Sequence, residues 1–290
     1  MPADKYTAVW VSHSSISDFL ACPRAYFLKH IYRDPQTGHK IKITTPSLTL
    51  GQAVHEVLDE ISTLPTEGRF KLPLPERLDR IWKKVEGKRG GFRDTDVENT
   101  YKERARTMLA RVALHPGPLK NLAVKIKTDL PYFWLSEEDG LILCGKIDWL
   151  EYLPDTDSVH IIDFKTGKRD EDPASLQLPI YHLLVGGCQT RPATRSSYWY
   201  LDRNDEPTEQ KLPDLKTAHA EVLKIARDMK LARQLERFKC PHGESGCFAC
   251  RPLEAIRRGE GELVGQDEQE RDMYLLDQSL TDAMPESEII

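Results

Sequence analysis

The 290-residue chain lacks the long hydrophobic runs that membrane proteins and secreted precursors carry. No stretch approaches about 18 consecutive apolar residues, so we expect no membrane span. The first residues, MPADKYTAVWVSHSS, have no basic flank followed by an apolar run, so we expect no secretory signal. Both absences favour a cytoplasmic protein, in which clustered thiols among the six cysteines bind metal more often than they form disulfides.

A functional nucleotide-binding loop is also missing. Residues 140–147, GLILCGKI, fit the spacing G-x-x-x-x-G-K, but Ile147 stands where such a loop carries Ser or Thr. The residues between the two glycines are apolar and typical of a strand, whereas a phosphate-binding loop needs small, flexible residues. We therefore expect no bound NTP.

Negative charge is concentrated at the end of the chain. The net charge is −5, but residues 260–290 contain ten acidic residues and one basic residue, Arg271. The rest of the chain, 1–259, contains 36 acidic and 40 basic residues, a net charge of +4. A mildly basic body is compatible with a polyanionic partner. We interpret residues 256–290 as an acidic, flexible tail.

Apolar spacing divides the chain into a helical first part and a strand-rich second part. Helices are predicted over 15–32 (with a second helix starting at Pro23), 46–64, 76–115 (one or two helices), 173–186 and 214–238. Strands are predicted within 122–153, 159–165 and 196–201. This order indicates an α/β fold in which helices pack on a mixed β-sheet.

Two acidic residues are predicted to face each other across a hairpin. Strands 145–153 and 159–165 flank PDTDS, a turn signal, and a four-residue loop would pair residues whose numbers add up to 311. Asp148 then lies opposite Asp163, with Cβ atoms about 5 Å apart. Carboxylates this close repel each other, and a bound Mg²⁺ or Mn²⁺ would remove the repulsion.

Lys165 shares the strand face of Asp163, because side chains two residues apart point the same way. An ammonium group in this position can orient a water molecule or stabilise charge that develops on a phosphate. The alternative for the whole segment is an edge hairpin with a different register and solvated charges.

Four sequence blocks, spread over about 130 residues, together resemble the RecB-like branch of the PD-(D/E)xK nucleases. In chain order the blocks are GQAVH (51–55), GKID (145–148), IIDFKTG (161–167) and QLPIY (177–181). The resemblance implies a restriction-endonuclease-like mixed β-sheet core flanked by helices, over residues 123–239. A helical N-terminal region, 1–122, would precede this core, and a cysteine cluster segment, 240–255, would follow it.

The resemblance also implies a role for the residues of the central blocks. Asp148 and Asp163 would bind the divalent metal ion, Mg²⁺ or Mn²⁺, together with the backbone carbonyl of Phe164. His55 would be a further metal ligand, with a core histidine as the alternative. Lys165 would be the catalytic lysine.

Cysteines at both ends of the body suggest a second metal centre. Cys240, Cys247 and Cys250 form C-x6-C-x2-C, and Cys22 lies in the early segment ACPRAYF. This layout is similar to that of the iron–sulfur members of the family, the AddB-type and CRISPR-associated exonucleases, and implies a [4Fe–4S] cluster on the four cysteines. The alternative is a zinc site on Cys240, His242, Cys247 and Cys250, without Cys22.

The chain is therefore predicted to be a metal-dependent DNA nuclease. By the resemblance, Gln177 and Tyr181 would position the DNA, and the activity would be that of an exonuclease on single-stranded DNA or DNA ends, in DNA repair, recombination or CRISPR adaptation. Gln177 and Tyr181 could instead only cap and pack their helix. The alternative function is a nuclease-fold DNA-binding subunit that is active only with, or is a scaffold for, a helicase or CRISPR integration partner. The segment RAYFLKHIYR (24–33) offers bases a charged and stacking surface.

Overall fold

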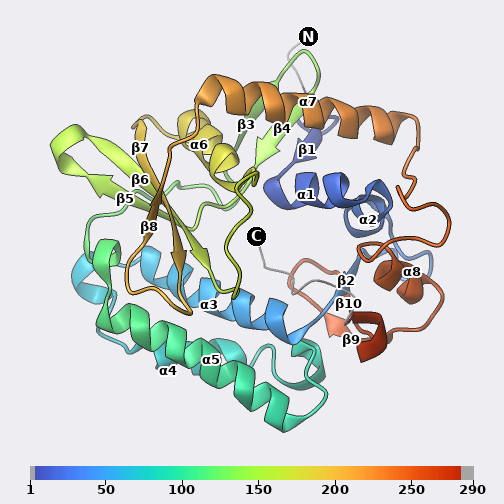
Figure 1. Cartoon of the computed structure of the whole chain (residues 1–290), viewed down its shortest axis with the longest axis horizontal. Helices are drawn as coiled ribbons and strands as arrows, with labels where there is room; N and C mark the ends of the chain where they lie inside the picture. The colour runs from blue at the N-terminus through green and yellow to red at the C-terminus, as the bar shows by residue number, and fades with distance from the viewer. Residues whose placement is uncertain (1–3, 282–290) are drawn as a thin grey trace.

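The computed structural model describes residues 4–281, in which the first half is mainly helical and most of the strands follow residue 130 (Figure 1). The helices are α1 (His13–Ala21), α2 (Pro23–Tyr26), the π-helical segment η1 (Phe27–Ile31), α3 (Pro46–Ser62), α4 (Leu74–Trp82), α5 (Thr95–Leu114), α6 (Gln177–Cys188), α7 (Leu215–Gln234), α8 (Arg251–Arg257) and α9 (Gln278–Thr281). The strands are β1 (Val9–Val11), β2 (Ile41–Ile43), β3 (Tyr132–Ser136), β4 (Leu141–Cys144), β5 (Trp149–Leu153), β6 (Ser158–Lys165), β7 (Ala193–Tyr200), β8 (Thr208–Gln210), β9 (Glu262–Gln266) and β10 (Asp272–Leu275). In this part of the chain, no helix has both the length and the apolar character that crossing a membrane requires.

The largest sheet has the strand order β5-β6-β7-β8 and carries the centre of the fold. β6 pairs antiparallel with β5 and parallel with β7, and α6 connects β6 to β7. Neighbouring residues of β6 point to opposite faces. Ile161 packs with α6 and α7, whereas Ile162 packs with α3, α4 and α5. Because both faces are covered, every residue of β6 is buried, including the charged Asp163 and Lys165. The predicted mixed sheet flanked by helices is confirmed.

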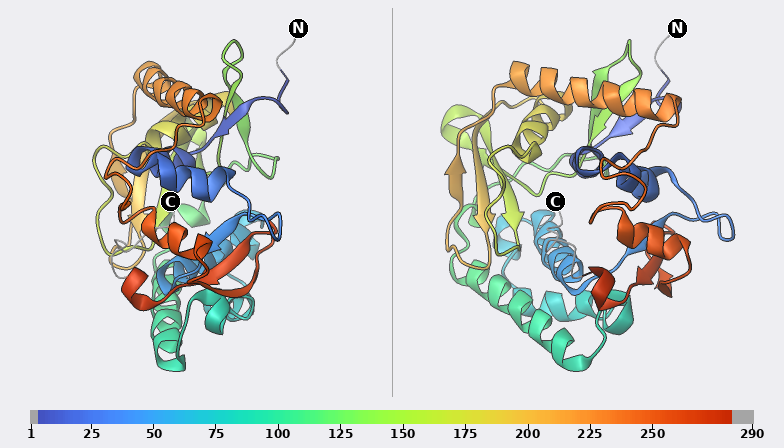
Figure 2. Two further views of the ribbon diagram at one scale, coloured as in Figure 1. Left: turned by 90° about the vertical axis from the view of Figure 1, so that its right-hand side faces the viewer. Right: turned by 45° about the vertical axis from the view of Figure 1, so that its right-hand side comes forward.

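Two smaller sheets have the orders β1-β4-β3 and β2-β10-β9. β1 runs parallel to β4, and β2 runs parallel to β10. The predicted helical region, 1–122, therefore also contributes strands to both sheets. Figures 1 and 2 show α2 and η1 beside α8, so segments from opposite ends of the chain lie next to each other.

The predicted hairpin is confirmed in its register but not in the length of its first strand. Leu153 pairs with Ser158 and Trp149 pairs with Ile162, so the partner numbers add up to 311. Residues 145–148 do not belong to the strand, because β5 begins only at Trp149. The side chain of Asp148 accounts for the late start of β5. Its Oδ2 accepts the backbone N–H of Phe164 at 2.9 Å, in the place that a backbone carbonyl would take in a longer ladder.

The prediction of a flexible tail is wrong for residues 256–281. After α8 the chain forms β9, β10 and α9, and apolar side chains of β10 are buried. Asp272 is fully buried and accepts hydrogen bonds from Thr37 Oγ1 at 2.6 Å and from Gln266 Nε2 at 2.9 Å. The high content of acidic residues predicted a solvated tail. The same segment, however, also contains the residues of β10, which pair with β2 near the other end of the chain. The rest of the predicted tail, 282–290, lies outside the described residues.

Leu78 belongs to the core that α3, α4 and α5 build against the central sheet, and its side chain is 0% exposed. We expect Leu78→Ala to lower the free energy of unfolding by about 2–5 kcal/mol, because it removes buried contacts and leaves a cavity. The control is Leu114→Ala, at a side chain 75% exposed, which should change it by no more than about 0.5 kcal/mol. Urea unfolding followed by circular dichroism measures both, and equal effects would contradict this assignment of the core.

Candidate metal-binding cleft and cysteine cluster

A cleft of about 720 Å³ opens at the end of β6. Its walls come from α3, the bend before β5, the end of β6 and the first turns of α6. Sites far apart in the sequence meet here because β5 and β6 are neighbours, while α3 and α6 cover opposite faces of their sheet. The predicted site residues that line the cleft are His55, Asp148, Asp163, Phe164, Gln177 and Tyr181.

The two acidic residues of the hairpin differ in how their oxygens are satisfied. Asp148 Oδ2 accepts the N–H of Phe164. Asp163 Oδ2 is buried and lies 3.1 Å from Lys165 Nζ, and it accepts no well-aligned hydrogen bond among the described residues. Burial raises the pKa of Asp163 to about 7, since the attraction of Lys165 offsets the burial and the repulsion of Asp148 only in part. A buried carboxylate oxygen that accepts no hydrogen bond and has a single cationic neighbour is a favourable ligand for a hard cation.

His55 lies among three hydrogen-bond acceptors. Its Nδ1 is 2.9 Å from the carbonyl oxygen of Gly51, and its Nε2 is 3.0 Å from that of Phe164 and 3.3 Å from Asp148 Oδ2. Because all three partners accept, both ring nitrogens carry protons in this arrangement. Burial alone would lower the pKa of His55, but the charge and hydrogen bond of Asp148, the hydrogen bond to Gly51 and the charge of Asp163 together outweigh burial and raise the pKa to about 9. With Nδ1–H donating to Gly51, the neutral ring presents Nε2 as a metal ligand.

Lys165 is held in the interior by two carboxylates. Its Nζ lies 3.1 Å from Asp163 Oδ2 and 2.7 Å from Glu171 Oε2, and the side chain is 1% exposed. Burial opposes the charged form, but Asp163 and Glu171 together hold the pKa of Lys165 above its usual range. The lysine therefore stays protonated beside the cleft.

Glu171 is a site residue that the sequence did not reveal. It lies in the loop between β6 and α6, within the run RDEDP, which reads as a solvated, charged segment. In the structure its backbone N–H donates to the hydroxyl of Tyr200 at 3.0 Å, and this bond turns the loop back onto the sheet. No local pattern predicts this contact, because it joins the loop to the far end of β7.

His13, at the start of α1, is a second residue of the cleft that sequence reasoning missed. Burial lowers its pKa to about 4, so the ring is neutral near pH 7. Its Nδ1 is buried without a hydrogen-bond partner among the described residues. The residue stands within a Ser-rich segment, and nothing in that segment predicts its place beside Lys165.

Gln177 and Tyr181 line the wall opposite His55 from the first turns of α6. Gln177 is 1% exposed, and its Oε1 has no hydrogen-bond partner among the described residues. Burial and the nearby carboxylates of Asp148 and Asp163 raise the pKa of Tyr181 well above its usual range, so its hydroxyl keeps its proton. The pair can thus offer an amide and a hydroxyl to a ligand in the cleft.

The charges that line the cleft do not by themselves favour an anion. Histidines excluded, the basic residues are Lys42, Lys84, Lys146 and Arg271, and the acidic residues are Glu56, Asp59, Asp148, Asp163 and Glu268. Some of the bases are neutralised by acids, as in the Lys146–Asp59 ion pair of 2.7 Å. A divalent cation between Asp148 and Asp163 would make the total charge positive, as a phosphate ligand requires.

Four cysteines form a second centre. The Sγ atoms of Cys22, Cys240, Cys247 and Cys250 all lie within 4.8 Å of one another, and all four residues are buried. Burial raises the pKa of Cys22 to about 12 and also raises that of Cys250, whereas backbone N–H groups help to lower the pKa of Cys247, so at least Cys22 would lose its proton only when a cation binds. Four such cysteines can bind a metal ion or an iron–sulfur cluster. His242 is exposed and does not belong to this group.

Backbone N–H groups point at the sulfurs, as in other sulfur-ligated centres. The N–H of Cys247 donates to Cys250 Sγ at 3.2 Å, and that of His242 donates to Cys240 Sγ at 3.4 Å. Cys144 lies apart, buried in β4, and Cys188 is partly buried at the end of α6.

Comparison with protein families gives a match over most of the chain. The family described as the PD-(D/E)XK nuclease superfamily matches residues 10–252. The match begins in β1 and ends in α8, so it includes all four clustered cysteines and the cleft residues except Glu268 and Arg271. β9, β10 and α9 lie outside it.

The sequence allows two ligand sets for the cysteine site, and they differ in their fourth ligand, which is Cys22 in one set and His242 in the other. We expect Cys22→Ser to lower the metal content of anaerobically purified protein by more than half, because a hydroxyl is a poor substitute for a thiolate on a soft metal. His242→Ala should leave the metal content unchanged. Mass spectrometry for iron and zinc measures both, and the opposite result would support the site with His242 as a ligand.

Proposed function

The chain belongs to the PD-(D/E)XK nuclease superfamily, and we propose that it is a metal-dependent deoxyribonuclease that hydrolyses phosphodiester bonds in the cleft at the end of β6. The observation that supports this most is the buried Oδ2 of Asp163 beside Asp148 and His55, which accepts no hydrogen bond among the described residues and has only Lys165 as an ion-pair partner. Carboxylate oxygens, a carbonyl oxygen and an imidazole nitrogen suit Mg²⁺ or Mn²⁺.

Asp148, Asp163, the carbonyl of Phe164 and His55 would hold the ion. When bound, it supplies a water ligand of lowered pKa and positive charge for the phosphate. In the metal-free arrangement a proton on His55 Nε2 lies between Phe164 O and Asp148 Oδ2. The same groups therefore already converge on a positive charge.

Lys165 acts through charge and position. Lys165 does not itself line the cleft: Asp163 and Glu171 hold its ammonium in the interior beside the cleft residue Asp163, from where its charge would stabilise the negative charge that develops on the phosphate and help to orient the attacking water. The water oxygen forms the new bond to phosphorus, and the bond to the leaving sugar oxygen breaks in line with it. Gln177 and Tyr181 hold the strand by hydrogen bonds from the opposite wall.

We further propose the RecB-like branch, and with it exonuclease action on single-stranded DNA or DNA ends, in DNA repair, recombination or CRISPR adaptation. The support is the order of the four blocks and the Asp at position 163. The chemistry of the cleft does not depend on the pathway.

For the cysteine site we propose a [4Fe–4S] cluster. All four ligands are thiolates, which is typical of such clusters, and Cys22 would join the start of α2 to the segment between α7 and α8. The alternative is one tetrahedral zinc ion, for which sulfurs about 3.8 Å apart are needed at a Zn–S distance of about 2.3 Å. Cys247 Sγ and Cys250 Sγ, at 3.8 Å, fit that distance as well.

Asp148→Ala should abolish Mn²⁺-dependent degradation of end-labelled DNA while DNA binding is retained, because it removes a metal ligand and leaves the surface intact. Lys165→Met should lower the rate by about 10²–10³-fold. The control is Asp205→Ala, at an exposed carboxylate paired with Arg111 away from the cleft. If wild-type protein with its cysteine site loaded binds DNA but cuts none with Mg²⁺ or Mn²⁺, the DNA-binding subunit that works with a helicase or CRISPR integration partner is the better account.

Anaerobically purified protein should be brown and absorb near 400 nm, with about four irons per chain, since thiolate-bound clusters absorb there. Cys22→Ser should remove the absorbance, whereas Cys144→Ser, at a buried cysteine outside the group, should keep it. A colourless protein that holds one equivalent of zinc would exclude the cluster.

A further inference from the structure

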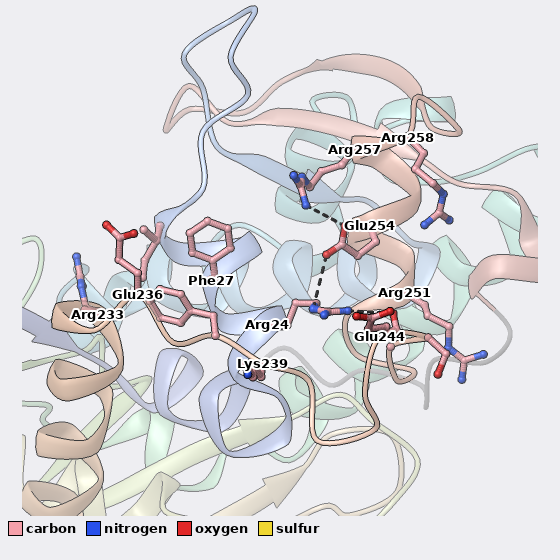
Figure 3. A pocket seen from close by; sticks show the side chains of 14 residues that line it. Arg24, Phe27, Arg233, Glu236, Lys239, Glu244, Arg251, Glu254, Arg257 and Arg258 are labelled. Carbon is pink, nitrogen blue, oxygen red and sulfur yellow. Dashed lines mark hydrogen bonds and ion pairs between the residues drawn. The ribbon is translucent and has the colours of Figure 1, made fainter.

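A second cavity, of about 910 Å³, lies beside the cysteine cluster and has no lining residue in common with the metal-binding cleft. We call it the arginine pocket. It is formed by α2 and η1, the end of α7, the segment 238–246 and α8 (Figure 3). The proposed nuclease chemistry uses none of these residues.

The arginine pocket is lined by more basic than acidic side chains. The basic residues are Arg24, Arg233, Lys239, Arg251, Arg257 and Arg258, and the acidic residues are Glu236, Glu244 and Glu254. Glu254 already pairs with Arg257 at 3.0 Å and with Arg24 at 3.9 Å, as Figure 3 shows. Within residues 4–281, Arg233, Lys239 and Arg251 have no carboxylate within ion-pair distance. Three cations are thus available to a ligand that carries several negative charges.

An aromatic wall lies between these cations. Phe27 and Phe238 line the pocket, and their rings stack at a centroid distance of 5.0 Å and an angle of 26°. Both side chains are only partly buried. Figure 3 shows Phe27 between Arg233 on one side and the arginines of α8 on the other. Cations flanking an exposed ring are the combination by which proteins hold unpaired bases together with their phosphates.

The cysteine cluster holds this pocket together. Arg24 follows Cys22 by two residues, Gly246 precedes Cys247, and Arg251 follows Cys250. Each of these residues lines the pocket, so binding of metal by the four cysteines fixes the walls relative to one another.

The segment η1 separates the arginine pocket from a neighbouring groove, which in turn adjoins the metal-binding cleft. η1 presents Phe27 and Ile31 to the arginine pocket, and Lys29 and His30 to a neighbouring groove. That groove shares Lys42 and Arg271 with the metal-binding cleft. In this groove Lys29 pairs with Asp18, and Lys42 and Arg271 pair with Asp267. Arg33 and Lys40, which also line it, have no carboxylate within ion-pair distance among the described residues, so a polyanionic strand can follow these two cations between the cavities.

We propose that the arginine pocket binds single-stranded DNA, with phosphates on Arg233, Lys239 and Arg251 and an unpaired base against Phe27 and Phe238. This proposal rests on the proposed function for the identity of the ligand and adds a second, non-catalytic place at which the strand is held. A base in a duplex is already stacked on its neighbours, so the aromatic wall selects a single strand.

The test compares two variants with the same loss of charge. Arg233→Ala/Lys239→Ala/Arg251→Ala removes the three cations, and Lys211→Ala/Lys216→Ala/Lys224→Ala removes three exposed lysines that line none of the cavities described. Binding of a labelled oligothymidylate is measured at several salt concentrations, without Mg²⁺ or Mn²⁺. The metal content of each protein is checked, so that loss of the cysteine centre is recognised.

For the arginine-pocket variant we expect weaker binding and a slope of log K against log salt that is smaller by about 0.7 per phosphate contact, or about 2 in total. The lysine control should keep the wild-type slope. Phe238→Leu, which keeps an apolar side chain but removes the ring, should weaken binding by about fivefold or more without changing the slope.

An arginine-pocket variant with intact metal content and the wild-type salt slope would overturn the proposal. Equal binding of duplex, unaffected by Phe238→Leu, would overturn its assignment to single strands. Binding is measured without divalent metal, so its outcome does not depend on cleavage. Failure to cut DNA in the separate assay with Mg²⁺ or Mn²⁺ would count against the proposed nuclease and not against this pocket.

Discussion

Burial of charge on β6 is the constraint on which the site depends. The strand is covered on both faces, yet it carries Asp163 and Lys165 into the interior. Charged groups are costly to bury unless partners of opposite sign compensate them. Lys165 has two such partners, Asp163 and Glu171. The two carboxylates Asp148 and Asp163 are compensated less fully, because Asp163 shares the charge of Lys165 with Glu171 and Asp148 has only a protonated His55. The cleft is thus arranged for one more positive charge at the point where the hairpin ends.

The surrounding structure serves this arrangement. β5 begins only at Trp149, where the carboxylate of Asp148 accepts the N–H of Phe164 and lines the cleft. α3 packs against the same face of the sheet and brings His55 to the carbonyl of Phe164. Tyr200 anchors the loop that returns Glu171 to Lys165. None of these elements forms the site alone, and the cleft exists because the fold brings them together.

Local pattern was enough to predict most of the helices, the strands of the central sheet up to β7, and the hairpin register. The turn signal PDTDS and the numbers of its flanking residues placed Asp148 opposite Asp163, and Pro23 correctly marked the start of a second helix. The failures concern contacts between distant segments. Glu171 lies in a charged loop whose sequence predicts exposure to solvent. The segment of β9 and β10 was predicted to be a flexible tail, because the pairing of β10 with β2 joins distant parts of the chain and has no local sequence signal. The close approach of Cys22 to the late cysteines agrees with the predicted cluster set, and only the tertiary structure could separate it from the alternative with His242.

The central claim is that a divalent cation binds where the hairpin, α3 and α6 meet. Anomalous diffraction from crystals soaked in Mn²⁺ tests it most directly, because it locates the ion independently of any activity. The account predicts one strong manganese peak within ligand distance of His55 Nε2, Asp148, Asp163 and the carbonyl oxygen of Phe164, at about 2.0–2.3 Å from each. A fully occupied manganese site elsewhere, with this cleft empty and its side chains unchanged, would contradict it.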